Sequence, residues 1–347
     1  MKIISKYLKL LPVFLLVLVL TGCSDDDDNN TPTTVTVVDV AVANGFTSLA
    51  AALQATDLVT TLQGPGPFTV FAPTNEAFDD LLTATGLDLA NLSTSEEELV
   101  RQILLNHVIV GTEVPSSAIT TTGIYANTGA DAPGNNNLSI YARVNADNNN
   151  TVEINGGDGT TSAPRNGADV TTPDVPADNG VIHVINKVLG LPTVVDMALA
   201  NPEFGSLVAS LTTAGQPDFV SILSTANGTS PAPFTVFAPT NAAFQTLLDS
   251  NMMWNSPADI DSALLTAVLQ HHVLAGQNVQ SGDLNQSGTT SPETLQGQTI
   301  DITLPGTNGN IADVVDGAGN EAGIRAVDVQ TSNGVIHVVN AVLLPAS

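Results

Sequence analysis

Residues 67–78 read PFTVFAPTNEAF, and residues 233–244 repeat them as PFTVFAPTNAAF, with eleven of twelve positions identical. A second segment, NGVIHVIN at 179–186, returns as NGVIHVVN at 333–340. The copies lie 166 and 154 residues apart, whereas the units of solenoid proteins repeat every 20–50 residues. The sequence therefore indicates one domain written twice, in agreement with the two domains that 347 residues suggest.

Both copies carry the same local signals. Phe68–Phe71 is rich in residues that favour β-strands and is followed by Ala72-Pro73. Proline has no backbone N–H to donate to a neighbouring strand, so we expect the strand to end there. Thr74 and Thr240 follow and fit the N-cap of a helix. Every residue of the runs 181–185 and 335–339 is apolar except one histidine in each. Side chains of a strand alternate between its two faces, so these runs predict strands buried on both faces.

A further helix is expected in each copy. Ser95 with Glu98 fits a capping box at its start in the first copy, and Ser256-Pro257 gives the corresponding start in the second. The helices carry matching apolar stripes: Val100, Ile103, Leu104 and His107, then Leu265, Val268, Leu269 and His272. His271 stands one position off its stripe, so we expect it to be exposed.

Composition excludes several classes of protein. The chain has 34 acidic and 8 basic residues, a net charge of −26, so it lacks the basic surface that binds nucleic acid. Its single cysteine, Cys23, excludes a disulfide scaffold within the chain and a cysteine-rich zinc site.

The N-terminus has the pattern of an export signal. Three lysines precede the apolar run Leu10–Leu20, which is too short to span a membrane. The run leads into Leu20-Thr21-Gly22-Cys23, which resembles a bacterial lipoprotein signal, although an ordinary cleaved signal with a chance cysteine would look similar. We therefore expect a signal peptide at 1–22 and a lipidated Cys23 with an acidic, flexible tether over 23–35. The Asp25–Asp28 run is either a solvated leash or a surface-export signal.

The repeated segments resemble the two signature segments of fasciclin domains, with His107 and His272 at the family's Tyr-His position between them. The resemblance assigns domains to 36–191 and 192–347, with the boundary near Gly190–Thr193. It implies an α+β fold of two tandem domains, each a β-wedge or sandwich packed with a cluster of helices. The sequence departs from the family in two places of each copy: Asn106 and His271 replace Tyr, and Asn186 and Asn340 replace a frequent Asp.

We expect structural roles for the family-motif positions, which are Thr74, Asn75, His107, His183, Thr240, Asn241, His272 and His337. A metal site would pair His107 with His183, and His272 with His337, but zinc needs three or four ligands. No G-x-S-x-G, P-loop or dinucleotide motif occurs. We therefore expect no enzyme activity and no cofactor, and a convergent carboxylate pair remains the open alternative.

Two further features have competing interpretations. The oxygen-rich loops Asp147–Asn150, Asp158 and Asp313–Glu321 offer weak calcium ligands, or are simply polar turns. Trp254 follows Met252 and Met253 and forms either a sugar- or protein-contacting patch or part of the core.

The resemblance implies adhesion or matrix contact outside the cell. We expect a surface-exposed lipoprotein of a bacterial outer membrane, which touches the membrane only through its lipid. Its partner would be a protein or glycan on a neighbouring surface or matrix. The alternative is a glycan-binding module of a polysaccharide-handling system.

Overall fold

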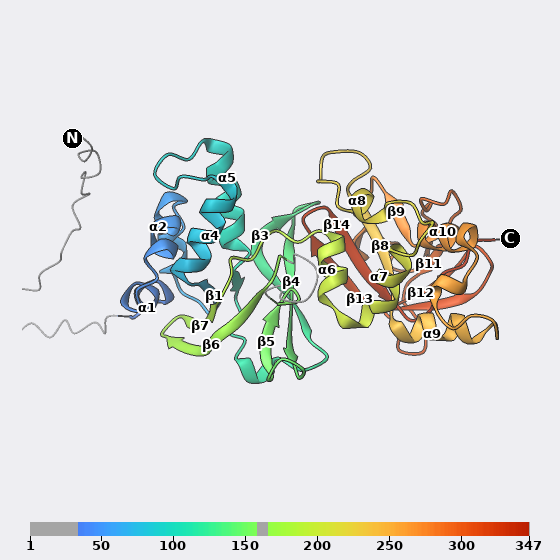
Figure 1. Ribbon diagram of the computed structural model, residues 1–347, viewed down its shortest axis with the longest axis horizontal. Coiled ribbons are helices and arrows are strands. Elements are labelled where there is room, and N and C mark those ends of the chain that lie inside the picture. Colours follow the sequence, from blue (N-terminus) through green and yellow to red (C-terminus); the bar gives the residue numbers. More distant parts are fainter. Residues whose placement is uncertain (1–33, 158–165, 347) are drawn as a thin grey trace, which may run out of the picture. The chain divides into compact units, whose positions relative to one another are not determined.

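The computed structural model describes residues 34–157 and 166–346. It places Thr34–Ser347 in one compact unit that contains two similar halves, each with one seven-stranded sheet and a group of helices (Figure 1). Cys23 and Asp158 lie outside the described residues.

The first half contains, in chain order, α1 (Val37–Ala43), α2 (Thr47–Ala55), α3 (Val59–Leu62), β1 (Phe68–Pro73), α4 (Asn75–Thr85), α5 (Thr94–Leu105), β2 (Val108–Val110), η1 (Ser116–Ala118), β3 (Ile124–Ala132), β4 (Asn136–Asn145), β5 (Thr151–Ile154), β6 (Ala168–Ala177) and β7 (Gly180–Ile185). The second contains α6 (Val194–Ala200), η2 (Pro202–Phe204), α7 (Gly205–Leu211), α8 (Phe219–Leu223), β8 (Phe234–Pro239), α9 (Asn241–Asp249), η3 (Pro257–Asp259), α10 (Ser262–His271), β9 (Val273–Ala275), η4 (Ser281–Asp283), β10 (Thr289–Thr290), β11 (Asp301–Thr303), β12 (Ala312–Val315), β13 (Glu321–Thr331) and β14 (Gly334–Val339).

The two sheets share one topology. The first has the order β2-β1-β7-β6-β5-β4-β3, and the second, taken from its opposite edge, is β9-β8-β14-β13-β12-β11-β10. In each sheet the two repeated segments form a parallel pair, β1 with β7 and β8 with β14, within otherwise antiparallel ladders. The structure therefore confirms two tandem domains of mixed α+β class.

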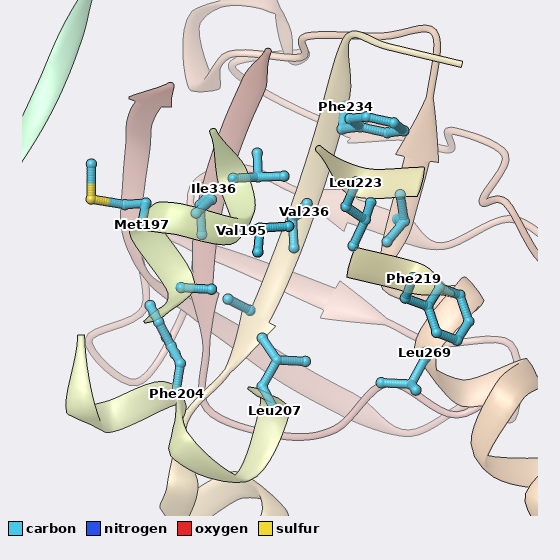
Figure 2. Close-up of a cluster of buried hydrophobic side chains, with 14 of the residues drawn as sticks. Val195, Met197, Phe204, Leu207, Phe219, Leu223, Phe234, Val236, Leu269 and Ile336 are labelled. Carbon is cyan, nitrogen blue, oxygen red and sulfur yellow. The ribbon is translucent and has the colours of Figure 1, made fainter. Parts of the chain in front are cut away.

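Each half has a core on both faces of its sheet. In β1, Phe68, Val70 and Ala72 pack among the helices, whereas Phe71 packs on the other face among residues of β4, β5 and β6. Every residue of β1 is buried, and β7 and β14, for which the sequence predicted burial on both faces, are buried at all but one position. Figure 2 shows the helical core of the second half, in which Phe204, Leu207, Phe219 and Leu223 belong to one buried cluster with Phe234, Val236 and Ile336 of the strands.

Glycine is required where the repeated strands approach each other most closely. A Cβ atom on Gly180 would lie 2.1 Å from the carbonyl oxygen of Phe68, and one on Gly334 would lie 2.2 Å from that of Phe234. No L-side chain fits at either position unless the backbone moves.

The helix caps agree with the sequence in part. The Thr74 and Thr240 hydroxyls accept hydrogen bonds from the third residue of α4 and α9, as expected for N-caps. The capping box of α5, however, is Ser93 with Glu96, two residues before the predicted pair. Ser256 opens only the 3₁₀ turn η3, and α10 begins after its own N-cap, Asp261. In both cases a competing cap residue lay within a few positions, and sequence spacing alone did not separate them.

Hydrogen bonds connect the halves within the compact unit. The Gln330 amide donates to Ser139 Oγ at 3.0 Å, and Asn201 Nδ2 donates to the Tyr125 hydroxyl at 2.8 Å. Tyr141 of β4 also packs with the helical core of the second half. The connector Gly190–Thr193 is short and contains Pro192, a combination that favours contact between the two halves, as these bonds show.

In each half, the segment just before the first helix is hydrogen-bonded to the turn between the last two strands. The Val35 carbonyl accepts from the Asp178 amide at 2.9 Å, and the Val35 amide donates to the Asp178 carboxylate at 2.6 Å. In the second half, the Pro192 carbonyl accepts from the Ser332 amide at 2.7 Å. The chain is thus attached to the β6–β7 and β13–β14 turns where each half begins.

Candidate functional site

The threonine and asparagine of the first repeated segment organise the helices. Asn75 Oδ1 accepts from the Ser48 amide at 3.0 Å, and Asn75 Nδ2 donates to the Gly45 carbonyl at 2.9 Å. This joins the start of α4 to the start of α2. Asn241 makes the corresponding bonds in the second half, with the Ser206 amide and the Pro202 carbonyl.

His107, just after α5, and His272, at the C-terminal end of α10, are buried and neutral. His107 Nε2 accepts from the Leu189 amide at 2.8 Å, so its proton lies on Nδ1, 2.6 Å from the Ile103 carbonyl. His272 repeats this arrangement with Leu343 and Val268. Burial lowers the pKa of both imidazoles to about 4, so the neutral form predominates at pH 7.

The strand histidines are occupied in a similar way. His183 Nδ1 accepts from the Asp174 amide at 3.2 Å, which leaves Nε2–H to donate to the Val114 carbonyl at 2.9 Å. His337 has the same partners in the second half, Asp328 and Val279. Both nitrogens of all four motif histidines are therefore in use, and a metal ion would have to displace a main-chain hydrogen bond. In the described ranges no three His, Cys, Asp or Glu side chains gather in a way that could hold a metal.

In each half a serine, an aspartate and a histidine lie close together, but their arrangement is unsuited to acyl transfer. The Asp174 carboxylate accepts from the amide and hydroxyl of Ser116, and it lies 3.9 Å from His183 Nδ1. The hydroxyl bond is the main cause of the lowered pKa of Asp174. A nucleophilic triad needs the imidazole beside the hydroxyl, whereas here the carboxylate lies between them. Ser281, Asp328 and His337 repeat the arrangement.

The expectation that His271 is exposed is wrong. Its ring is fully buried, its Nδ1 lies 3.2 Å from Thr294 Oγ1, and its Nε2 accepts from the Gly317 amide at 3.2 Å. The turn between β12 and β13 covers this side of α10, so the helix is buried over a wider arc than its apolar stripe indicated. Burial lowers the pKa of His271, and the nearby Asp316 carboxylate opposes that shift.

In the expected calcium loop Asp313–Glu321, both aspartates accept hydrogen bonds from other groups of the chain. Asp316 accepts from the amides of Ala318, Asn320 and Leu344, and Asp313 accepts from the Thr307 amide and the Asn310 side chain. These bonds shape the turns around β12 and hold the C-terminal segment. Calcium binding stays a prediction.

The asparagine that opens the second repeated segment was not singled out from sequence. Asn179 Oδ1 accepts from the Val37 amide at 2.8 Å, and its Nδ2 donates to the carbonyls of Leu62 and Gly64. Asn333 makes the corresponding bonds with Val194, Leu223 and Thr225. The repetition of Asn-Gly at 179 and 333 was the available signal.

The second half contains an open, uncharged groove of about 440 Å³. It lies between α9, α10, the β12–β13 turn and the C-terminal segment, and its lining includes Leu247, Trp254, Ile260, Leu264, Leu344 and Pro345. Ser250 supplies the one side-chain hydroxyl of the lining. Trp254 packs against the core, as one interpretation predicted, and it also lines this groove. Its contact with a sugar or a protein stays a prediction.

Comparison with known proteins defines the class. Residues 44–192 and 202–345 match the fasciclin domain model, so the chain belongs to the fasciclin domain family. A FAS1 domain pair from the insect cell adhesion molecule fasciclin I has the same fold, with a TM-score of 0.54 and 21% identity over 87% of this chain and 98% of that one. The helices of the described residues are too short or too polar to cross a bilayer.

Related sequences come from fungi, animals and bacteria. A fasciclin-like arabinogalactan protein of Arthroderma benhamiae is 28% identical over 80% of this chain, and human periostin is 28% identical over 87%. The chain spans only 58% and 31% of these two relatives. The cell surface glycolipoprotein MPB83 of Mycobacterium bovis is 34% identical over 42% of this chain and 57% of its own length.

Proposed function

We propose that this chain is a lipid-anchored adhesion protein of a bacterial cell envelope, displayed on the outer membrane, and that it has no enzymatic activity. The observation that carries the proposal is that two complete fasciclin domains in tandem account for nearly all of the described residues. A cell adhesion molecule with the same domain pair and a cell-surface glycolipoprotein relative support it.

The site residues support a binding role rather than a catalytic one. The motif histidines hold main-chain groups through both ring nitrogens, and Ser116 and Ser281 bond to carboxylates rather than to an imidazole. We therefore expect the chain to contact its partner through surface residues rather than through the motif histidines.

Charge limits which surfaces can be partners. With a net charge of −26, the protein repels other anionic surfaces within a Debye length of about 8 Å at physiological salt. Contact then depends on close shape complementarity or on a cationic partner. Many tethered copies, each with two domains, would strengthen weak individual contacts through avidity.

The test begins with Cys23→Ala, with Ser24→Ala as the matched control. Cells that produce Cys23→Ala should release the protein and lose attachment to a matrix-coated surface, whereas Ser24→Ala cells should keep both. Protease treatment of intact cells should remove residues 36–346 from the wild type. Attachment that persists while the Cys23→Ala product is freely secreted contradicts the proposal.

A glycan-binding role is the second candidate, and the groove beside Trp254 is the feature that favours it. Sugar recognition combines an aromatic platform with several directed polar groups, and here the lining side chains contribute one hydroxyl. We therefore rank protein contact first. Saturable binding of a neutral oligosaccharide that disappears in Trp254→Ala would reverse this order.

A further inference from the structure

The groove of the second half exposes more apolar surface than folding requires. Met252 is fully exposed and Met253 is 78% exposed; neither lines the groove, but both directly precede Trp254 in the sequence, and Trp254 does line it. Leu264 of α10, another lining residue, is 41% exposed. Scattered single apolar residues on a surface are ordinary, but a group around a groove is typical of a binding site.

The duplication provides an internal comparison. The corresponding connection in the first half, between α4 and α5, carries Leu87, Leu89 and Leu92, which pack against the first helical core. In the second half the connection between α9 and α10 carries two methionines that turn to solvent instead. The fold can therefore bury the apolar residues of this connection, and their exposure is specific to the second half.

The exposed methionines belong to a defined turn. Asn251 holds it: its carbonyl accepts from the Trp254 amide at 2.9 Å, and its Oδ1 accepts from the Met253 amide at 3.0 Å. The Asn251 amide in turn donates to the Leu248 carbonyl at the end of α9. The turn is thus ordered before any partner binds, and flexible methionine side chains adapt to varied apolar surfaces.

Three aspartates adjoin the groove lining in the sequence. Asp249 adjoins Ser250, and Asp259 and Asp261 flank Ile260; all three carboxylates are exposed. Residues 192–347 contain thirteen acids and a single base, Arg325, whose guanidinium donates to the Gly309 carbonyl. The negative charge beside the groove therefore remains available to a cationic partner.

We propose that this groove binds an amphipathic peptide segment of a protein partner, with an apolar side chain against Trp254 and Leu264 and with lysine or arginine beside Asp249, Asp259 and Asp261. The proposal rests on the adhesion function proposed above, for which it specifies the chemistry of the partner. A second copy of the chain is disfavoured because two bodies of charge −26 repel each other.

Trp254 is the only tryptophan of the chain, so its fluorescence reports directly on the groove. The probe is a helical peptide of leucine and lysine, about four turns long and free of aromatic residues. It is added to the full chain carrying Cys23→Ala, so that no acyl chain competes. We expect a saturable blue shift of the emission that weakens at high salt. A matching leucine–glutamate peptide should give none.

Variants distinguish binding of the peptide in the groove from non-specific electrostatic attraction. Leu264→Asn should weaken binding about tenfold because it removes a buried apolar contact, and Asp249→Asn should weaken it severalfold. The matched control is Leu99→Asn, at the corresponding position of α5, where the leucine is 43% exposed. This control should bind as the wild type does. Equal affinity of Leu264→Asn and Leu99→Asn overturns the proposal.

The experiments distinguish a peptide in the groove from a glycan or a second copy of the chain, and they test the adhesion function separately. A blue shift produced by cellohexaose but not by the leucine–lysine peptide assigns the groove to glycans and overturns the proposal. Self-association in sedimentation that Met252→Ser/Met253→Ser abolishes assigns it to a second copy and also overturns it. Peptide binding in a protein that does not support cell attachment contradicts the adhesion function alone. Attachment that requires the chain but not Leu264 contradicts the groove as its contact.

Discussion

The imidazole of His107 accepts a hydrogen bond from the amide of Leu189, 82 residues further along the chain. It thereby joins the end of α5 to the segment that leaves β7. His272 makes the same connection with Leu343 in the second half. In both cases the acceptor nitrogen must remain unprotonated, which makes the connection between helix and sheet dependent on pH.

Acidification should therefore destabilise the protein between about pH 6.5 and 4. The unfolded chain takes up protons on His107 and His272 near pH 6.5, whereas the native pKa of each is about 4. The free energy of unfolding should fall by about 1 kcal/mol per pH unit for each histidine over this interval. Urea unfolding at pH 7 and pH 5 measures the difference. His107→Gln, which cannot take up the proton, should reduce the pH dependence; an unchanged dependence contradicts this explanation.

Gly180→Ala should destabilise the first half by about 3 kcal/mol, because the new Cβ would lie 2.1 Å from the Phe68 carbonyl oxygen. Gly334→Ala should do the same in the second half. Gly282→Ala is the control, since open space surrounds that position. Thermal unfolding followed by circular dichroism compares the three. A Gly180→Ala variant as stable as Gly282→Ala would show that the two strands can separate at little cost.

Asn179→Ala should cost about 3 kcal/mol of unfolding free energy, because it leaves the Val37 amide and the Leu62 carbonyl without this partner in a buried setting. Asn333→Ala should cost a similar amount. Asn91→Ala, an exposed asparagine, serves as control. Hydrogen exchange should show faster exchange in α1 for Asn179→Ala and in α6 for Asn333→Ala. Loss spread evenly over both halves would contradict the local role.

Thr74→Ala should destabilise by about 1 kcal/mol through loss of the α4 N-cap. Thr83→Ala, at an exposed position inside the same helix, should be neutral or slightly stabilising because alanine favours helix. Chemical denaturation of the two variants provides the comparison. Equal effects would mean that the Thr74 hydroxyl does not stabilise the helix.

Much of the fold follows from repetition and local pattern. The run 68–71 indicated a strand because it is rich in β-formers, and 181–185 indicated a strand buried on both faces because apolar residues occupy both. The structure pairs the two in parallel. The Thr74 cap follows from a polar residue between a strand and an apolar helix pattern. Capping at α5 could not be placed as well, because Ser93 and Ser95 both have a glutamate three residues later.

The long-range partners could not be predicted. No sequence pattern indicates that Asn179 reaches Val37 or that His107 reaches Leu189, since these bonds depend on how helices and sheet pack. His271 was misplaced for the same reason: the turn at Gly317 that covers it comes from a distant part of the chain. The groove beside Trp254 likewise depends on the C-terminal segment, which contributes Leu344 and Pro345.

The attachment of Val35 to Asp178 has a mechanical consequence. Tension applied to the chain before residue 34 enters the folded part at this pair of hydrogen bonds, which join it directly to the β6–β7 turn. Force that passes on to the second half arrives at the corresponding bond between Pro192 and Ser332. Under shear flow, each domain would thus be pulled at the turn of its β6–β7 or β13–β14 hairpin, and the hydrogen bonds at that turn would carry the load first.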